Sequence, residues 1–241
     1  MTDTAETTAA QGPTLEAALA ALQAQADPER ADGMAAYHKV DRPYLGVPNP
    51  VLNDLARDWR AELTLEARIA LAAGLWHTNI HEARVVAAKL LTQARIRPDD
   101  AAVWWLICSW VPQFDAWAIA DHVCTAGQRR IMADLTRLDE VEAWTTHDHL
   151  WTKRAALVMT LGLTKANHPS AAERAARERV LGWAAGYVSD QRWFIQKAVA
   201  WWLRDLSKHD ALAVTAFLQT HGDEMRPFAR KEAGKYLADA G

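Results

Sequence analysis

The sequence contains only two cysteines, Cys108 and Cys124, and no Cys-x-x-Cys pair. It therefore cannot build a disulfide framework. No uninterrupted apolar run reaches the length of about 18 residues that a membrane-spanning helix requires. The first residues lack a basic segment followed by an apolar run, so no secretory signal is expected. These absences favour a reduced cytoplasmic protein.

The common catalytic motifs are missing as well. The sequence has no glycine pattern of a Walker or Rossmann nucleotide site, and no order of serine, cysteine and histidine typical of a nucleophilic enzyme. His77 and His81 are four residues apart, but HEARV is not the HExxH zinc motif and no third ligand is evident. We therefore expect neither a metal nor an organic cofactor.

Alanine and tryptophan are abundant instead. The chain has 48 alanines, and 12 tryptophans against four phenylalanines and four tyrosines. Alanine is the strongest helix former, while tryptophan supplies a wide aromatic face with one N–H group. Such faces usually fill a core, but they also recognise bases and cations.

From residue 14 onward the sequence predicts helices and no strands. Thr14 begins TLEAALAALQAQA, Asn49-Pro50 begins PVLNDLARDW, and Thr64 caps TLEARIALAAGLW. Prolines at positions 98 and 169 mark later breaks, and no window has the alternation of a strand. Residues 1–13 are polar and aperiodic, which predicts a disordered tail. We expect one all-α domain over residues 14–241.

A basic residue followed by small apolar residues recurs in this domain, at Arg84, Arg154, Lys197 and Lys231. The separations are roughly compatible with one helix pair every 35 to 43 residues, as in HEAT-like repeats. Stacked pairs of this kind form a solenoid whose concave face is a binding surface. A helical bundle without repeats is the alternative.

Charge is distributed unevenly along the chain. Residues 192–235 carry a net charge of +3, whereas the whole chain carries −3. A basic C-terminal third on a mildly acidic protein indicates a local site for a polyanion. Solvated helix faces give the same pattern, so charge alone does not decide.

The segment DAWAIADHVC places Trp117 and Asp121 on one helix face, because residues four apart are neighbours there. Asp121 lies among apolar residues, where a carboxylate loses solvent and requires a partner or a function. In LWTKRAALVMTLGL, Arg154 lies on an otherwise apolar stripe that continues to Leu161. Arg154 either extends to the surface or pairs with a buried acid such as Asp121. A purely structural Asp121 is the alternative to a catalytic one.

A separate stripe runs along FIQKAVAWWLRDLSK and consists of Lys197, Trp201, Arg204 and Lys208. One tryptophan among three cations suits an aromatic ring that faces a base or sugar, with phosphate contacts on either side. The alternative is an interface tryptophan with solvated cations around it.

Several segments, taken in order, resemble the DNA alkylation repair family, the AlkD-like DNA glycosylases built from HEAT-like helical repeats. The resemblance extends from about Met34 to Leu237 and rests on MAAYHKVDRPYLGVPNPVLNDLARDW, FDAWAIAD, LWTKRAALVMTLGL, FIQKAVAWWLRDLSK and RPFARKEAGKYL. Several segments that match the family in the same order are far more specific than any single segment.

The resemblance implies an active site of two tryptophans and an aspartate in the concave cleft, with an arginine close by. Matched by motif, these residues are Trp117, Trp201, Asp121 and Arg154. Tyr37 matches an aromatic residue near the DNA. The phosphate-facing positions are matched by Arg204, Arg230 and Lys231, to which the stripe adds Lys197 and Lys208.

Two positions depart from the family pattern. Ala118 stands where an acid often occurs, and Pro48 follows LGV where a polar residue can occur. The family also contains members that bind branched DNA without glycosylase activity. The presence of Trp117, Asp121 and Trp201 argues against that class.

The implied reaction is compatible with these residues. A purine alkylated at N3 or N7 is already cationic, so its glycosidic bond is weakened and the leaving base needs no general acid. Asp121 would stabilise the oxocarbenium-like sugar and orient water. The faces of Trp117 and Trp201 would hold the cationic nucleoside.

We therefore expect a monomeric glycosylase that excises alkylated purines from double-stranded DNA in the cytoplasm and on the nucleoid, without a metal, a cofactor or a membrane. A non-catalytic binder of damaged or branched DNA and a protein-interaction scaffold are the alternatives. A scaffold gives no reason to place Asp121, Arg154 and Trp201 within apolar segments.

Overall fold

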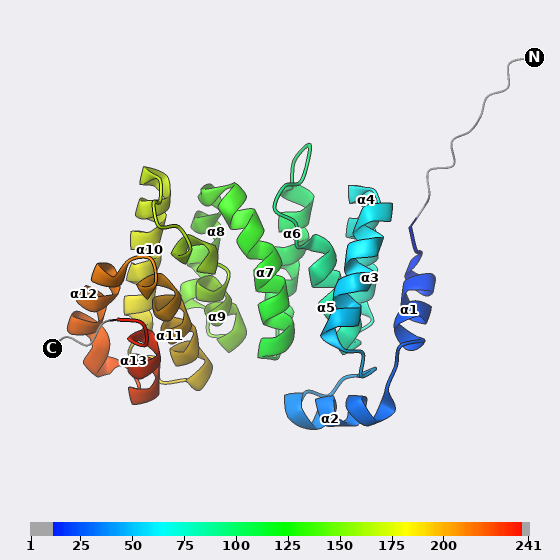
Figure 1. Cartoon of the computed structure of the whole chain (residues 1–241), viewed down its shortest axis with the longest axis horizontal. Coiled ribbons are helices and arrows are strands. Elements are labelled where there is room, and N and C mark those ends of the chain that lie inside the picture. The colour runs from blue at the N-terminus through cyan, green and yellow to red at the C-terminus, as the bar shows by residue number, and fades with distance from the viewer. Residues whose placement is uncertain (1–11, 238–241) are drawn as a thin grey trace, which may run out of the picture. The chain divides into compact units, whose positions relative to one another are not determined.

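The computed structural model describes residues 12–237 (Figure 1). Within this range the chain forms thirteen α-helices, five short 3-10 helices and no strand, which confirms the all-α prediction. None of these helices is both long and apolar enough to cross a membrane. The predicted disordered tail, residues 1–13, falls outside the described residues except for its last two positions.

The chain divides into two compact units, with the boundary between residues 107 and 108. The prediction of one domain over residues 14–241 stays a prediction. The helices of the first unit are α1 (Leu15–Gln23), α2 (Pro28–His38), α3 (Asn49–Glu62), α4 (Leu65–His77), α5 (His81–Leu91) and α6 (Ala101–Trp110), whose last residues belong to the second unit. In this unit α5 packs against both α3 and α4 (Figure 1).

The second unit is built around α9 and α11. Helix α9 packs between α7 and α11, and α11 also packs against α12 and α13 (Figure 1). Its α-helices are α7 (Trp117–Ala133), α8 (Leu138–Glu142), α9 (Leu150–Val158), α10 (Ala171–Tyr187), α11 (Trp193–Ser207), α12 (Ala211–His221) and α13 (Pro227–Ala233). The 3-10 helices are η1 (Val111–Gln113), η2 (Leu135–Arg137), η3 (Ala143–Thr146), η4 (Leu161–Thr164) and η5 (Gly222–Glu224).

Side-chain caps begin several of these helices where the sequence predicts them. The hydroxyls of Thr14 and Thr64 accept from the third backbone N–H of α1 and α4. Ser170 forms a reciprocal capping box with Glu173 at the start of α10. Helix α3 begins at Asn49, so Pro50 occupies its second position rather than its first.

The prediction that one helical apolar stripe continues from Leu150 to Leu161 is wrong at its C-terminal end. Helix α9 stops at Val158, and Leu161 begins the separate helix η4. The hydroxyl of Thr160 donates to the carbonyls of Ala156 and Leu157, at 3.2 and 2.9 Å. Such a bond competes with the backbone for the carbonyls that would continue the helix.

Arginine side chains satisfy many of the carbonyls that helix ends leave without a backbone partner. Arg60 donates to two carbonyls at the end of α5, at 2.8 and 3.0 Å. Arg177, which is buried, donates to the carbonyls of Leu163 and Ala166, at 2.9 and 3.0 Å. Each of these bonds joins a helix to a turn that is distant in sequence.

Tryptophan and alanine fill the interior together. Trp76, Trp110 and Trp202 are fully buried, and most of the other buried side chains are alanine, leucine and valine. On one face of α11, Phe194 is half-buried, and the buried residues are Ile195, Val199, Trp202 and Leu206. This packing leaves the neighbouring face of α11, which carries Trp201, open to other contacts.

The turn between α10 and α11 is held by Asp190. Its carboxylate accepts from Lys153 of α9 at 2.8 Å and from Arg192 at 2.6 Å, and only 13% of its side chain is exposed. The Arg192 hydrogen bond lowers the pKa of Asp190 most, and with that of Lys153 it outweighs the opposing effect of burial.

We predict that Asp190→Asn destabilises the protein by about 1.5–3 kcal/mol at pH 7, because both charged hydrogen bonds weaken. The pKa of Asp190 is lowered in the folded state, so its contribution is complete above the ordinary value of about 3.9 and is lost as the pH falls through the lowered value. Urea unfolding from pH 7 to pH 2 should show a stability difference between the two proteins that is constant down to about pH 4 and shrinks below it, because only there does the unfolded state begin to bind the proton. A difference that does not shrink between pH 4 and pH 2 would contradict the assignment.

Candidate functional site

Asp121 and Arg154 form an ion pair between α7 and α9. Nη1 of Arg154 donates to Oδ1 of Asp121, and Nη2 lies 3.3 Å from Oδ2, so the guanidinium engages both oxygens. The arginine side chain is 6% exposed and the aspartate side chain 24%. Of the two possibilities that the sequence leaves open for Arg154, the structure has the pair, with the negative member closer to solvent.

Close packing of α7 against α9 holds the two charges at this distance. Gly127 is one and a half turns beyond Asp121 on α7, and a Cβ atom there would lie 2.3 Å from Sδ of Met159. A side chain at that position would require the Met159 side chain to move. The glycine therefore leaves room for Met159, at the end of α9, to pack against α7.

A cavity of about 170 Å³ opens beside the pair, between α7, η4 and α11. Asp121 lines it from α7 and Trp201 lines it from α11. The other lining residues are Thr125, Gln128, Val158, Leu161, Lys165 and Asp205. Arg154 lies behind Asp121 and is not among the lining residues, so the carboxylate and not the guanidinium faces the cavity.

Asp205 is a second carboxylate at this cavity, and it was not among the residues predicted from the sequence. Its side chain is 7% exposed and pairs with Lys165. Burial acts to raise the pKa of Asp205, but the hydrogen bond and charge of Lys165, with the charges of Lys208 and Arg204, outweigh it and lower the pKa. The sequence does contain a signal, since Trp201 and Asp205 repeat the four-residue spacing of Trp117 and Asp121.

The two candidate tryptophans differ in their surroundings. Trp201 is half-buried at the cavity, whereas its neighbour Trp202 is completely buried in the core. Trp117 is the first residue of α7, one turn before Asp121, and is 36% exposed. The structure thus brings Asp121, Arg154 and Trp201 together and places Trp117 at the adjoining helix end, outside the cavity lining.

The predicted cationic stripe on α11 is partly neutralised. Arg204 pairs with Glu232 of α13, and Lys208 lies 3.6 Å from Asp205. Lys197 is exposed, with its Nζ 5.7 Å from the ring centre of Trp193. The stripe therefore presents less uncompensated charge than its sequence indicates.

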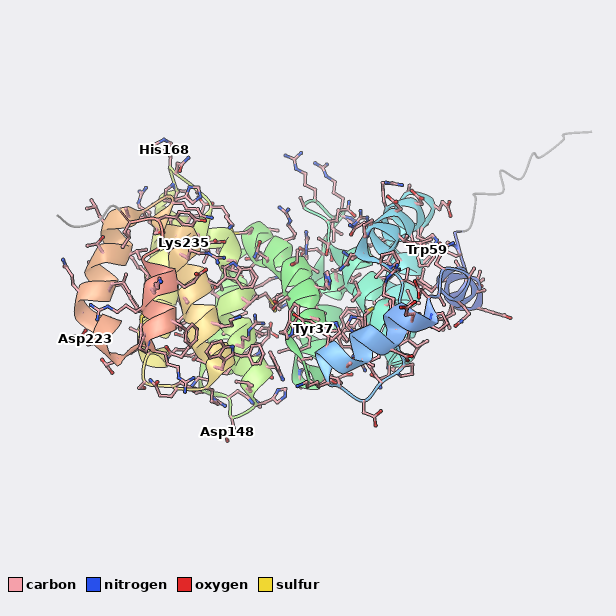
Figure 2. All side chains as sticks on the ribbon, turned by 60° about the horizontal axis from the view of Figure 1, so that its bottom comes forward. Tyr37, Trp59, Asp148, His168, Asp223 and Lys235 are labelled. Carbon is pink, nitrogen blue, oxygen red and sulfur yellow. The ribbon has the colours of Figure 1, made fainter. Side chains whose placement is uncertain are left out.

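The remaining predicted DNA-binding residues occupy three different settings. Arg230 is exposed and pairs with Asp223 at 2.5 Å. Lys231 is exposed, and among residues 12–237 it has no hydrogen-bonding or ionic partner. Tyr37 belongs to the other unit, near the C-terminal end of α2, and is 69% exposed (Figure 2).

Both cysteines carry free thiols. Cys124 follows Asp121 by three residues on α7 and is completely buried. Burial, reinforced by the charge of Asp121, raises the pKa of Cys124, and burial likewise raises that of Cys108. Neither thiol has the depressed pKa of a nucleophilic cysteine.

The charged groups that line the cavity suit a cationic ligand. Two carboxylates and one lysine face it, next to the indole of Trp201, and an aromatic face attracts a cation. In the described part of the chain, no group of three or more histidine, cysteine, aspartate or glutamate residues is placed to hold a metal ion.

Comparisons with known proteins point to one family. The sequence profile of the family described as "DNA alkylation repair enzyme" matches residues 18–237. Among curated proteins, none matches the chain.

Solved structures share the fold. A predicted DNA alkylation repair enzyme from Enterococcus faecalis is 25% identical, with a TM-score of 0.75 over 90% of this chain and 98% of its own. The protein smu.31 from Streptococcus mutans UA159 is 18% identical, with a TM-score of 0.60 over 78% of this chain and 92% of its own. AlkD2 from Streptococcus mutans is 18% identical, with a TM-score of 0.59 over 80% of this chain and 91% of its own.

We predict that Arg154→Leu destabilises the protein by about 3 kcal/mol, the lower end for a broken buried pair, because Asp121 keeps some solvent. The double variant Arg154→Leu/Asp121→Asn should recover most of that loss, since no uncompensated charge remains. Urea unfolding of the two single variants and the double variant measures the coupling. If the losses of unfolding free energy in the two single variants simply add in the double variant, the two side chains do not interact directly.

Proposed function

This chain belongs to the DNA alkylation repair enzyme family, and from that membership we propose that it is a DNA glycosylase that excises cationic N3- or N7-alkylated purines from duplex DNA. The observation that carries the proposal is the carboxylate of Asp121, held on one side by Arg154 and open on the other to a cavity that Trp201 lines. A negative charge beside the substrate weakens binding to a polyanion but stabilises a developing sugar cation, which favours catalysis over binding alone.

The proposed reaction is hydrolysis of the bond between the deoxyribose C1′ and the purine nitrogen. That bond breaks first, and its electron pair moves to the base, which leaves as a neutral molecule because it was already cationic. The sugar becomes an oxocarbenium-like cation. Water then forms a new C1′–O bond and releases one proton. No proton has to be delivered to the leaving group, so a single carboxylate is sufficient.

Asp121 supplies the negative charge that this cation requires. A preorganised charge stabilises a transition state without reorganising at the moment of reaction, and the two-point contact with Arg154 provides that preorganisation. Arg154 is a positioning residue in this proposal, since it contacts the carboxylate and does not line the cavity. Asp121 also accepts a hydrogen bond from the attacking water and so orients it.

The tryptophans hold the substrate. A cation over an indole face gains about 0.5–2 kcal/mol, and Trp201 offers such a face beside Asp121. We assign Trp117, one helical turn before Asp121, to the other side of the same nucleotide. The exposed cations Lys197, Lys208 and Lys231, with Arg204, Arg230 and Tyr37, are proposed contacts to the DNA backbone.

The decisive experiment is release of free methylated base from DNA treated with a methylating agent. Release by the purified chain supports the glycosylase. Binding to that DNA without release would identify a non-catalytic binder of damaged DNA, and absence of both would leave a protein-interaction scaffold.

We predict that Asp121→Asn lowers the excision rate about 10²- to 10³-fold, the typical effect of removing one preorganised electrostatic group. Binding to undamaged duplex should persist, because the substitution removes no positive charge. Single-turnover excision and thermal melting on the same sample separate catalysis from stability. Asp139→Asn, a mostly exposed carboxylate paired with Arg179 in the same unit, is the matched control and should excise normally. A destabilised but fully active Asp121→Asn variant would rule out the catalytic role.

We also predict that Trp201→Ala lowers excision by about 2- to 30-fold, equivalent to the 0.5–2 kcal/mol of a cation–π contact. Trp105, which is 67% exposed on α6, serves as the control, and Trp105→Ala should leave excision unchanged. Rates are compared on the folded fraction of each variant. If Trp201→Ala lowers the melting temperature while the folded fraction excises normally, Trp201 is a core residue.

A further inference from the structure

The first unit contains an open pocket of about 630 Å³ that no feature of the proposed excision uses. It lies at the end of the unit where α3 stops and where the loop between α5 and α6 begins, toward the top of Figure 1. Its volume is within the range of about 300–1,000 Å³ that small-molecule sites occupy.

Five arginines line this pocket, and none of the residues that line it is acidic. They come from three segments of the chain: the last turns of α3, the first turn of α4 and the loop after α5. The arginines are Arg57, Arg60, Arg68, Arg95 and Arg97. The five positions are spread over 41 residues, so no single basic run in the sequence predicts this cluster.

Two of the five guanidinium groups are fixed in place. Arg60 donates to the two carbonyls at the end of α5 described above. Arg68 is buried and donates to Oε1 of Gln93 at 2.5 Å, while Nε2 of Gln93 donates to the carbonyl of Arg95 at 2.7 Å. The loop that carries Arg95 is therefore tied to the buried arginine below it.

The charges of the five are unequally compensated. Arg57 is paired with Asp54 and Asp58, at 2.7 and 2.9 Å, and belongs to the rim. Arg60 donates to backbone carbonyls, and Arg68 donates to the amide oxygen of Gln93. Arg95 and Arg97 are exposed, and within residues 12–237 their side chains have no hydrogen-bonding or ionic partner.

The electrostatic environment at the pocket favours an anion. Burial lowers the pKa of Arg60, and burial together with the charge of Arg60 lowers the pKa of the adjacent Lys89. Positive charge is thus held here against a desolvation cost and against repulsion between the cations, and the attraction of a bound anion would offset both.

We propose that this five-arginine pocket is a binding site for a phosphate group, separate from the Asp121 site. Arginine is suited to phosphate because its planar fork donates two parallel hydrogen bonds to two oxygens. In this proposal Arg60 and Arg68 are donors already held in position, and the exposed Arg95 and Arg97 contact the phosphate from the loop. The phosphate belongs either to a nucleic-acid backbone or to a free phosphorylated compound.

The test compares two double variants of the full chain that lose the same charge. Arg95→Gln/Arg97→Gln removes the two unpartnered cations of the pocket. Arg129→Gln/Arg174→Gln removes two exposed arginines of the other unit and is the control. Calorimetric titration with inorganic pyrophosphate at constant ionic strength is the first measurement. Anisotropy with an undamaged fluorescent duplex over a series of salt concentrations is the second. Thermal melting should find both variants as stable as the unaltered protein.

We expect the pocket variant to bind pyrophosphate at least tenfold more weakly than the unaltered protein, and the control to remain within twofold. If the pocket variant also binds the duplex more weakly, with a salt slope smaller by roughly 0.9 for each phosphate that it no longer neutralises, the ligand is a backbone phosphate. Normal duplex binding together with weakened pyrophosphate binding identifies a free phosphate compound. A pocket variant that matches the control in both measurements overturns the proposal. Base excision is not a readout here, so the result stands apart from the fate of the proposed glycosylase.

Discussion

A chain made of short helices must find partners for many backbone carbonyls, and in this protein arginine side chains supply them. Arg60, Arg84, Arg137 and Arg177 each donate to carbonyls at a helix end. A single guanidinium has five N–H donors, so it can bond two carbonyls and still retain a hydrogen for a third group. Because each of these bonds joins one helix to the end of another, they also fix how neighbouring helices pack. The positions of the functional side chains follow from that packing.

The candidate active site and the arginine pocket are variations on this arrangement. In both, an arginine donates hydrogen bonds to a fixed acceptor beside a cavity. The acceptor of Arg154 is a carboxylate that itself lines the cavity, where we propose that a cation binds. Arg60 donates to backbone carbonyls and Arg68 to the amide of Gln93, and these arginines themselves line the pocket where we propose that an anion binds. The two sites therefore differ in which member of the interaction faces the cavity.

The sequence predicts those parts of the fold that depend on local interactions. Thr14 and Thr64 cap helices within their own first turns, and the spacing of Trp117 and Asp121 follows from the helical repeat. The pairing of Asp121 with Arg154 was one of two possibilities, since an isolated charge on an apolar face must have either a partner or a route to solvent. Asp205 was missed because its partner Lys165 is 40 residues away. Its neighbours Arg204 and Lys208 also predict a solvent-exposed cationic helix face. The end of α9 was missed because a threonine hydroxyl competes there for backbone carbonyls.

The state of the two cysteines has a consequence for a protein that belongs to a DNA alkylation repair family. Thiolates are the strongest nucleophiles among protein side chains near neutral pH, and electrophiles that methylate DNA also attack them. Here one thiol is completely enclosed and the other is half-enclosed, and burial keeps both in the protonated form. The chain therefore offers almost no thiolate to methylating electrophiles, because both sulfur atoms lie on helices, α6 and α7, whose packing excludes much of the solvent.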